Sequence, residues 1–314
     1  MIAIVAPGQG AQTPGFLAPW LELDSFRDLL ATLSEAAELD LAQLATEADA
    51  DTIRDTAIAQ PLLVAAGIAT AAELVPDLPA DSVTAGHSVG EITAAALAGV
   101  LSPTDAMTFV ATRGRGMAEA SALRPTSMTA VVGGNADEVL AAIEKHGLTP
   151  ANNNGSGQVV AAGTVEQLAA LAEEPPARAR LFPLSVAGAF HTEHMAPAQD
   201  RLRDLAAGLT TSDPGVTLLS NRDGLPVASG AEFLDRLVSQ VTSPVRWDLC
   251  LEQLRTLGGA GGITGLLELA PAGTLTGIAK RNLKGVDLFN LNTPDQLDEA
   301  RAFVRTHTRE SENA

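Results

Sequence analysis

Gly86-His87-Ser88-Val89-Gly90-Glu91 lies between a short apolar run, Ser82 to Ala85, and an alanine-rich segment from Ile92 to Val100. The pattern predicts a buried strand, a sharp turn and a helix, which is the G-x-S-x-G arrangement of a nucleophile elbow. Ser88 would stand at the amino end of that helix, where N–H groups and the helix dipole stabilise the negative oxygen of an acyl-transfer intermediate. The alternative is a glycine-rich turn with an idle serine, and the flanking strand and helix favour the elbow.

The composition indicates a protein with a large core. The chain has 314 residues, 46% of them hydrophobic, which suits one sizeable domain or a large domain with a smaller partner. Its one cysteine, Cys250, excludes an internal disulfide and favours a reducing cytoplasm. The apolar start, Met1 to Ala6, lacks a basic region and is too short for a signal peptide or a membrane span. We therefore expect a soluble cytoplasmic protein.

The formal net charge of −18 argues against nucleic acid or an anionic membrane as a partner, because both require a basic surface. An anionic partner would need a local cluster of positive charge. The densest such cluster is Lys280, Arg281 and Lys284, and a second consists of Arg113, Arg115 and Arg124. Either cluster would equally suit a solvated face, which is the usual role of a charge run.

A strand is predicted at Ile2 to Ala6, followed by a glycine-rich loop, Pro7 to Gln12. The two glycines around Gln9 allow a close approach of the backbone to a ligand, so the loop would supply an oxyanion donor or else form an ordinary turn. The loop does not have the form G-x-G-x-x-G, and we predict no dinucleotide site.

Several helices are predicted from Leu21 to Leu74 by apolar residues at helical spacing. The last would have Pro61 in its first turn and run through Leu62 to Leu74. Ser102-Pro103-Thr104-Asp105 predicts another helix start, and that helix would carry Arg113 near its C-terminal end.

The segment 127–185 has a different pattern, with the order βαββαβ of a ferredoxin-like unit. The strands are predicted at Met128 to Val132, Thr149 to Asn153, Gln158 to Ala162 and Arg178 to Leu184, and the helices at Ala136 to His146 and Val165 to Glu174. We interpret it as a small subdomain inserted into an α/β catalytic domain formed by residues 1–126 and 186–306, with a frayed tail at 307–314. A cleft between the two units is a usual place for a ligand.

A serine nucleophile needs a base, and the chain has five histidines. We set aside His87 because it lies inside the elbow, His146 because it ends a helix, and His307 because it lies in the tail. His191 and His194 remain, just past the small subdomain. Together they have the form His-x-x-His, but no third ligand at a recognisable spacing accompanies them, and we predict no metal site.

The chain resembles the malonyl-CoA:acyl carrier protein transacylases, the acyltransferase family of fatty-acid and polyketide synthesis. The matching stretches are collinear from residue 7 to about residue 284: Pro7 to Gln12, Gln60-Pro61, Gly86 to Glu91, Arg113-Gly114, Asn152 to Gln158, Gly188 to His191, Ser243 to Trp247 and Leu275 to Gly277. The resemblance implies a hydrolase-like α/β domain with a mostly parallel sheet and a ferredoxin-like insertion.

The resemblance also implies a role for individual residues. Ser88 matches the acylated nucleophile, His191 its general base, and Gln240 the residue whose backbone carbonyl orients that base. Arg113 matches the arginine that pairs with the free carboxylate of malonyl, for which a planar guanidinium fork is well suited. The backbone N–H groups of Gln9 and Val89 match the oxyanion hole, and the pocket would be lined by Gln60, Asn152, Asn154 and Phe190.

The implied reaction is a ping-pong transfer from malonyl-CoA to the phosphopantetheine thiol of acyl carrier protein, by a monomer without a permanent cofactor. Val89 after the serine, and Phe190 before His191, favour malonyl over methylmalonyl, although one methyl group is worth only about 1–3 kcal/mol. Carrier proteins are acidic, so Lys280, Arg281 and Lys284 are the predicted docking residues, with Arg178 and Arg180 second. The chain departs from the family at Ala270 to Gly273, where Gly-Pro-Gly is usual, and at Asn153 to Ser156.

Two alternatives remain open from the sequence. The first is a serine esterase or thioesterase of α/β-hydrolase or patatin type. A hydrolase would need an acidic partner for its histidine, and a patatin would need a Ser-Asp dyad, for which Asp223 is the only candidate, but neither an HGGG loop nor a patatin glycine loop is present. The second is a non-catalytic subunit that binds carrier protein with a relic pocket, which the filled chemical positions disfavour.

Overall fold

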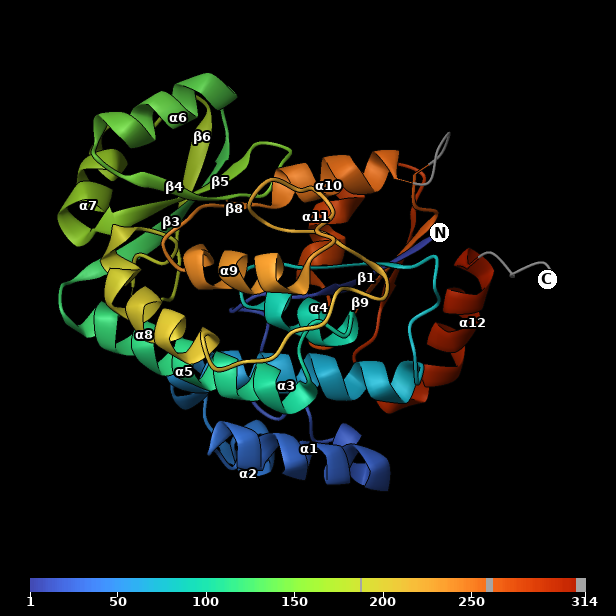
Figure 1. Ribbon diagram of the computed structural model, residues 1–314. Coiled ribbons are helices and arrows are strands. Elements are labelled where there is room, and N and C mark those ends of the chain that lie inside the picture. The colour runs from blue at the N-terminus through green and yellow to red at the C-terminus, as the bar shows by residue number, and fades with distance from the viewer. Residues whose placement is uncertain (187, 258–261, 309–314) are drawn as a thin grey trace.

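The protein is an α/β structure with two five-stranded sheets (Figure 1). The computed structural model describes residues 1–186, 188–257 and 262–308. The first sheet has the order β10-β9-β1-β2-β7, and all its pairs are parallel. Its strands are β1 (Ile2–Ala6), β2 (Val83–Gly86), β7 (Thr217–Leu218), β9 (Gly265–Glu268) and β10 (Asp287–Asn290). The central strands are wholly buried, as expected for a parallel sheet that is covered on both faces.

Helices cover both faces of this sheet. Alternate residues of β1 enter different cores: Ile2 and Ile4 join one, and Ala3 and Val5 join the other. The first core is built with α1 (Asp24–Ala37), α2 (Leu41–Glu47), α3 (Thr56–Leu74), α4 (Gly90–Leu97), α5 (Pro103–Ala122), α8 (Ala196–Ala206), α9 (Gly230–Gln240) and α12 (Leu297–His307). The second contains α10 (Trp247–Thr256) and α11 (Thr274–Asn282). Short 3-10 helices lie at Trp20–Glu22, Thr52–Arg54, Glu193–Met195 and Pro294–Gln296.

The second sheet has the order β6-β3-β5-β4-β8. With its helices it forms a second, smaller unit that lies beside the unit formed by the first sheet and its helices (Figure 1). Its chain order is β3 (Thr126–Gly133), α6 (Ala136–Lys145), β4 (Thr149–Asn153), β5 (Gln158–Thr164), α7 (Val165–Glu173) and β6 (Ala179–Pro183). All six predicted elements are present, with ends that differ by at most two residues from the predicted ones. The fifth strand, β8 (Val245–Arg246), comes from the later chain and pairs parallel to β4.

The helix that carries Arg113 is longer than predicted. It begins at Pro103, with the Ser102 hydroxyl accepting from the N–H of Asp105 as expected, but it continues to Ala122, so Arg113 lies in its middle. Two glycines within it permit close packing of neighbouring helices. A Cβ on Gly114 would lie 2.9 Å from the carbonyl oxygen of Thr56, and one on Gly116 would lie 3.2 Å from Ala198.

Two other predicted boundaries are wrong. Helix α3 begins at Thr56, where the Asp55 side chain caps the N–H of Ala57, so Pro61 lies inside the helix and not in its first turn. His307 is the last residue of α12 and not part of a frayed tail, because its ring packs on Phe303 and its Nδ1 lies 3.0 Å from Thr264 Oγ1. Residues 309–314 of the predicted tail lie outside the described part of the chain.

Of the helices that the structure describes, α3 alone has the length and apolar composition of a membrane span, and 78% of that window is buried within the protein.

The elbow depends on its two glycines. A Cβ on Gly86 would lie 1.9 Å from the carbonyl carbon of Gly90, and a Cβ on Gly90 would lie 2.3 Å from the carbonyl oxygen of Ala6. Between them Ser88 has a φ of 54°, in the left-handed region that non-glycine residues rarely adopt. The turn is therefore packed against the end of β1 with no room for a side chain at either glycine.

We expect Gly90→Ala to destabilise the protein by about 1–3 kcal/mol or more, because the new methyl group meets backbone atoms that cannot rotate away. Urea unfolding measures the change. The matched control is Gly277→Ala in α11, where nothing lies within 4 Å of the added Cβ. There alanine should stabilise the helix by up to about 1 kcal/mol. A Gly90→Ala protein as stable as the wild type would show that the elbow is not constrained in this way.

Candidate active site

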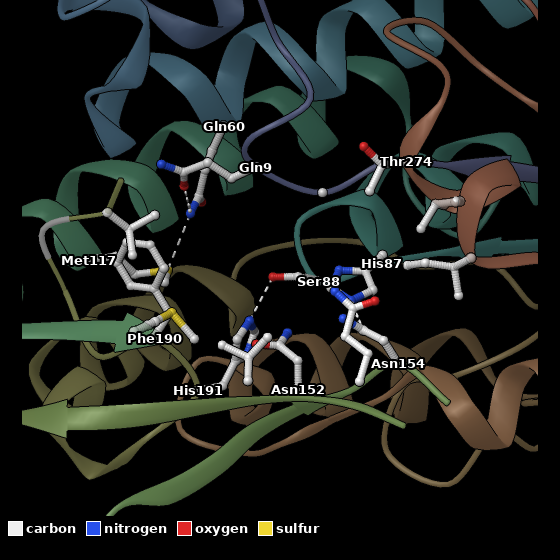
Figure 2. A pocket seen from close by; sticks show the side chains of 17 residues that line it. Gln9, Gln60, His87, Ser88, Met117, Asn152, Asn154, Phe190, His191 and Thr274 are labelled. Atoms are coloured by element: carbon white, nitrogen blue, oxygen red, sulfur yellow. Dashed lines mark hydrogen bonds between the residues drawn. The ribbon is translucent and has the colours of Figure 1, made fainter. Parts of the chain in front are cut away.

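A cavity of about 170 Å³ lies between the two units, and Ser88 is on its wall (Figure 2). One side is formed by the loop after β1, by the elbow and by the start of α11. Strands β3, β4 and β5 form the opposite side. The predicted pocket residues Gln60, Asn152, Asn154 and Phe190 all line it, together with Gln9, His87 and His191.

Ser88 and His191 are in contact, with 2.7 Å between Oγ and Nε2. His191 is 2% exposed and, like the serine, has a positive φ, of 61°. Its Nδ1 lies 2.8 Å from the backbone oxygen of Gln240. A carbonyl oxygen only accepts, so Nδ1 carries the proton and the bare Nε2 accepts from the Ser88 hydroxyl. His194, the other histidine left open by the sequence, lies in the 3-10 helix at 193–195 and does not line the cavity.

Burial and the nearby charge of Arg113 lower the pKa of His191 to about 3. The hydrogen bond to Gln240 opposes this shift but does not reverse it. A neutral imidazole with a free Nε2 lone pair is the form that accepts a proton from a serine.

Arg113 reaches the nucleophile from α5. Its Nη2 lies 3.4 Å from Ser88 Oγ and donates to the side-chain oxygen of Gln240 at 2.7 Å, while Nη1 donates to that of Gln60 at 2.6 Å. The residue is 1% exposed and does not itself line the cavity. Burial lowers the pKa of Arg113 to about 9, and the charge of Glu91 opposes that shift. The guanidinium therefore remains a cation at neutral pH, held on two neutral amide oxygens beside the serine.

The two predicted oxyanion donors lie in the elbow and in the loop after β1. Val89 is the N-cap residue of α4, and Gln9 lies in the loop after β1 and lines the cavity. Among the residues that the structure describes, neither backbone N–H has a hydrogen-bond acceptor. The side chain of Gln9 is anchored to Thr56 Oγ1 and to the carbonyl oxygen of Arg54, each at 3.3 Å. Both N–H groups are thus available to an oxygen on the substrate.

Sequence reasoning missed Asn221. Its side-chain oxygen accepts the N–H of Ser88 at 2.8 Å, and its side-chain nitrogen donates to the carbonyl oxygen of Gly86 at 2.8 Å. Asn221 therefore holds both ends of the turn. A polar pair, Ser220-Asn221, directly after the short strand beside β2 was the available signal. The acid considered for a hydrolase, Asp223, pairs instead with Arg236 at 2.8 Å.

His87 does not serve the nucleophile. Its Nε2 lies 2.9 Å from Asn154 Oδ1, and its ring packs edge-on to Trp247. Burial lowers the pKa of His87, so this side chain is a neutral part of the wall.

The predicted docking residues are exposed and lie at the far end of the helix that lines the cavity. Lys280 and Arg281 are in the last turn of α11, and Lys284 follows it. Thr274 at the start of the same helix lines the cavity, about 9 Å away along the helix axis. Arg178 and Arg180, the second candidates, are exposed at the edge strand β6.

No group of three or more His, Cys, Asp or Glu side chains that would hold a metal ion occurs in the described ranges of the chain.

Comparison with known proteins gives consistent matches over nearly the whole chain. The family model described as acyl transferase domain matches residues 4–294. The malonyl CoA-acyl carrier protein transacylase of Mycobacterium tuberculosis (strain H37Rv) is 53% identical over 95% of this chain and 99% of the relative. The crystal structure of MCAT from the same species superimposes with a TM-score of 0.90, at 52% identity over 96% of this chain and 99% of that one. A structure of a type II PKS acyl-carrier protein in complex with its malonyl-transacylase, PlMCAT:AntF, matches with a TM-score of 0.85 at 29% identity, over 96% of this chain and 99% of that one.

We expect His191 to remain neutral, with its proton on Nδ1, from pH 8 down to pH 5, because its pKa is lowered to about 3. Nitrogen-15 NMR of protein with labelled histidine measures this directly, and loss of the signal in His191→Ala assigns it. Free imidazole in the same sample is the control and titrates over this range. A His191 signal that titrates alongside free imidazole would contradict the expected shift.

Proposed function

The chain belongs to the acyl transferase domain family, and we propose that it transfers the malonyl group of malonyl-CoA to the thiol of an acyl carrier protein through an ester on Ser88. One observation carries the assignment of residues. Ser88 Oγ lies 2.7 Å from a neutral histidine and 3.4 Å from a buried arginine, and the histidine is oriented by a backbone carbonyl. The enzyme is an acyltransferase, as its relatives are.

In the first half-reaction His191 Nε2 takes the proton of Ser88, and the serine oxygen attacks the thioester carbonyl of malonyl-CoA. The carbonyl oxygen becomes negative and accepts hydrogen bonds from the backbone N–H groups of Gln9 and Val89. The carbon–sulfur bond then breaks, and the proton on His191 passes to the leaving thiolate of coenzyme A. The product is malonyl-Ser88 and a neutral His191.

The second half-reaction reverses these steps with another thiol. His191 takes the proton of the phosphopantetheine thiol of the carrier protein, and the sulfur attacks the ester carbonyl. The bond from carbon to the serine oxygen breaks, and His191 returns the proton to Ser88. The same base and the same oxyanion donors thus serve both directions.

Arg113 selects an acyl group that ends in a carboxylate. Each terminal nitrogen of the guanidinium carries two hydrogens, and one on each is used by Gln60 or Gln240. The second hydrogen of Nη1 is available to the malonyl carboxylate, and that of Nη2, which donates to Ser88 Oγ at 3.4 Å, can turn to the carboxylate once the serine carries the acyl group. Phe190, which is 6% exposed and lines the cavity, would crowd an α-methyl branch and favour malonyl over methylmalonyl.

The backbone carbonyl of Gln240, which accepts a hydrogen bond from His191, supports transfer over hydrolysis. A serine hydrolase usually stabilises its imidazolium with a carboxylate. Here Gln240 supplies a neutral oxygen, and Asp223 is engaged by Arg236. A non-catalytic role is disfavoured by the short contact between Ser88 and His191.

We further propose that residues 127–185 form a ferredoxin-like subdomain inserted into a hydrolase-like domain of residues 1–126 and 186–306. The strand order β6-β3-β5-β4 and the two helices of this segment support that assignment. The proposed reaction uses no group besides this chain, malonyl-CoA and the carrier thiol, so we propose that the enzyme needs no permanent cofactor and acts as a monomer. The single buried cysteine, Cys250, supports a cytoplasmic location.

Incubation with radiolabelled malonyl-CoA tests the function. We expect a stable label on Ser88 that moves to acyl carrier protein when the carrier is added, and no label on Ser88→Ala. Rapid release of free malonate would instead indicate a hydrolase. Absence of label on the wild-type protein would indicate a non-catalytic subunit.

Docking of an acidic carrier protein is expected to use the basic end of α11. Lys280→Glu with Lys284→Glu should raise the KM for the carrier about 3- to 30-fold at low salt, and less at high salt. Self-acylation by malonyl-CoA should hardly change. The control pair is Arg203→Glu with Arg305→Glu, two exposed residues of α8 and α12 on the other side of the first sheet. An equal rise in the KM for the carrier in both pairs of variants would show that the basic end of α11 is not the docking site.

A further inference from the structure

Glu91, the last residue of the elbow motif, is a buried carboxylate that the proposed mechanism does not use. It is 1% exposed, lies in the first turn of α4 and does not line the cavity. Its Oε1 accepts the backbone N–H of Asn221, and its Oε2 accepts the side-chain NH2 of Gln240. Both donors are neutral amides. A buried charge held only by neutral donors is costly, which suggests that it does something for its neighbours.

Gln240 connects this carboxylate to all three groups of the reaction. Besides its bond to Glu91, its NH2 group donates to the backbone oxygen of Ser88 at 3.0 Å. Its side-chain oxygen accepts from Arg113 Nη2 at 2.7 Å, and its backbone oxygen faces His191 Nδ1 at 2.8 Å. A change in the orientation of this one side chain would therefore change the hydrogen bond of Arg113 directly.

Glu91 reinforces that orientation by hydrogen-bond polarity, in the same sense as the Ser88 carbonyl oxygen, which also accepts from the NH2 group of Gln240. A side-chain amide has a donating and an accepting end that are nearly equal in shape. The backbone N–H of Asn221 is a fixed donor, so Glu91 must present an oxygen there, and as an anion it also presents an acceptor to Gln240. The NH2 group of Gln240 must face Glu91, and its oxygen must then face Arg113.

We propose that Glu91 is a positioning residue that, through the side-chain amide of Gln240, holds Arg113 on the acyl group of Ser88 and so sets the preference for acyl groups ending in a carboxylate. The inference rests on the proposed function. It assigns no contact between Glu91 and substrate.

The electrostatic surroundings of Glu91 agree with this arrangement. Burial raises its pKa to about 7, while the bonds from Asn221 and Gln240 and the charges of Arg113 on α5 and Arg236 on α9 act in the opposite direction. Cys250 on α10 is the other titratable group that faces it, and burial and the charge of Glu91 raise the pKa of that thiol. Protonated Glu91 would present a donor to the NH2 group of Gln240, so the preference for malonyl should weaken as the pH falls below about 7.

Glu91→Gln tests the polarity without changing the shape. Its oxygen must stay on the Asn221 N–H, so its NH2 group meets the NH2 group of Gln240 and displaces that amide. The bond from Arg113 to the Gln240 oxygen would then be weakened. We expect kcat/KM for self-acylation by malonyl-CoA to fall about 10- to 100-fold, as for a lost hydrogen bond to a charged group. Acylation by p-nitrophenyl acetate, which has no carboxylate to bind, should change less than about twofold, since it uses Ser88, His191 and the oxyanion donors but not Arg113.

Gln240→Leu provides a second, independent test. Leucine keeps the backbone oxygen that orients His191 but has no amide to connect Glu91 with Arg113. This variant should lose the preference for malonyl on its own, as Arg113→Ala should. Adding Glu91→Gln to it should cause no further loss, because residues that act through one contact are not additive.

Glu268→Gln is the matched control for loss of a buried carboxylate. Glu268 is 0% exposed and accepts N–H groups of Leu275 and Thr276 at the start of α11, with no bond to Arg113, Gln240 or Ser88 in the described structure. It should lower the melting temperature but leave the ratio of malonyl to p-nitrophenyl acetate acylation as in the wild type.

The same ratio should fall in the wild type as the pH is lowered from 8 to 6, and in Glu91→Gln it should not change with pH.

An equal loss of malonyl-CoA and p-nitrophenyl acetate acylation in Glu91→Gln would overturn the proposal, as would an unchanged ratio of the two. A double variant of Glu91→Gln and Gln240→Leu whose loss is the product of the two single losses would also overturn it. If Glu91→Gln does not fold, a wild-type ratio in Gln240→Leu overturns it by itself. A wild-type protein that reacts with p-nitrophenyl acetate but not with malonyl-CoA would instead contradict the proposed function.

Discussion

The backbone of Ser88, held at a positive φ between two glycines, is the constraint on which the rest of the site depends. The glycines remove the steric obstacle, and Asn221 supplies the hydrogen bonds that hold the turn at both ends. The turn aims the hydroxyl at His191 and leaves the N–H of Val89 without an acceptor among the residues that the structure describes. Strained residues of this kind persist where the surrounding structure over-determines them, and here the end of β1 and the start of α4 do so.

The two buried charges of the site lie beside the nucleophile, and the base is oriented by a neutral group. His191 is oriented by a neutral carbonyl, whereas Arg113 and Glu91 are both buried and are connected through the side chain of Gln240. The cation therefore disfavours protonation of His191, and no carboxylate favours it. In the proposed reaction this matters for the acyl-enzyme, since a base that stays neutral is ready to accept the proton of an incoming thiol.

Much of this organisation could be predicted from the sequence because it follows from local patterns. The elbow, the strand at Ile2–Ala6 and the six elements of the second unit are all marked by apolar runs and turn residues. The pairing of Ser88 with His191 came from elimination and resemblance. The length of α5 could not be read locally, because Gly114 and Gly116 resemble helix breakers and are in fact sites of close helix packing. Asn221 and Gln240 meet the elbow only after folding, across more than 130 residues of chain. No pattern of spacing reports such contacts.

The parallel pairing of β8 with β4 gives the two units a mechanical connection besides the covalent ones. The chain crosses between them before β3 and after β6, and two such crossings alone would permit a hinge. Strand β8 begins five residues after Gln240 and adds a further attachment at Asn152, on the wall of the cavity. Rotation of the smaller unit would have to break this pairing and would pull on the segment that orients His191. The pairing therefore opposes a change in the width of the cavity, which favours a substrate that enters with a long, thin arm.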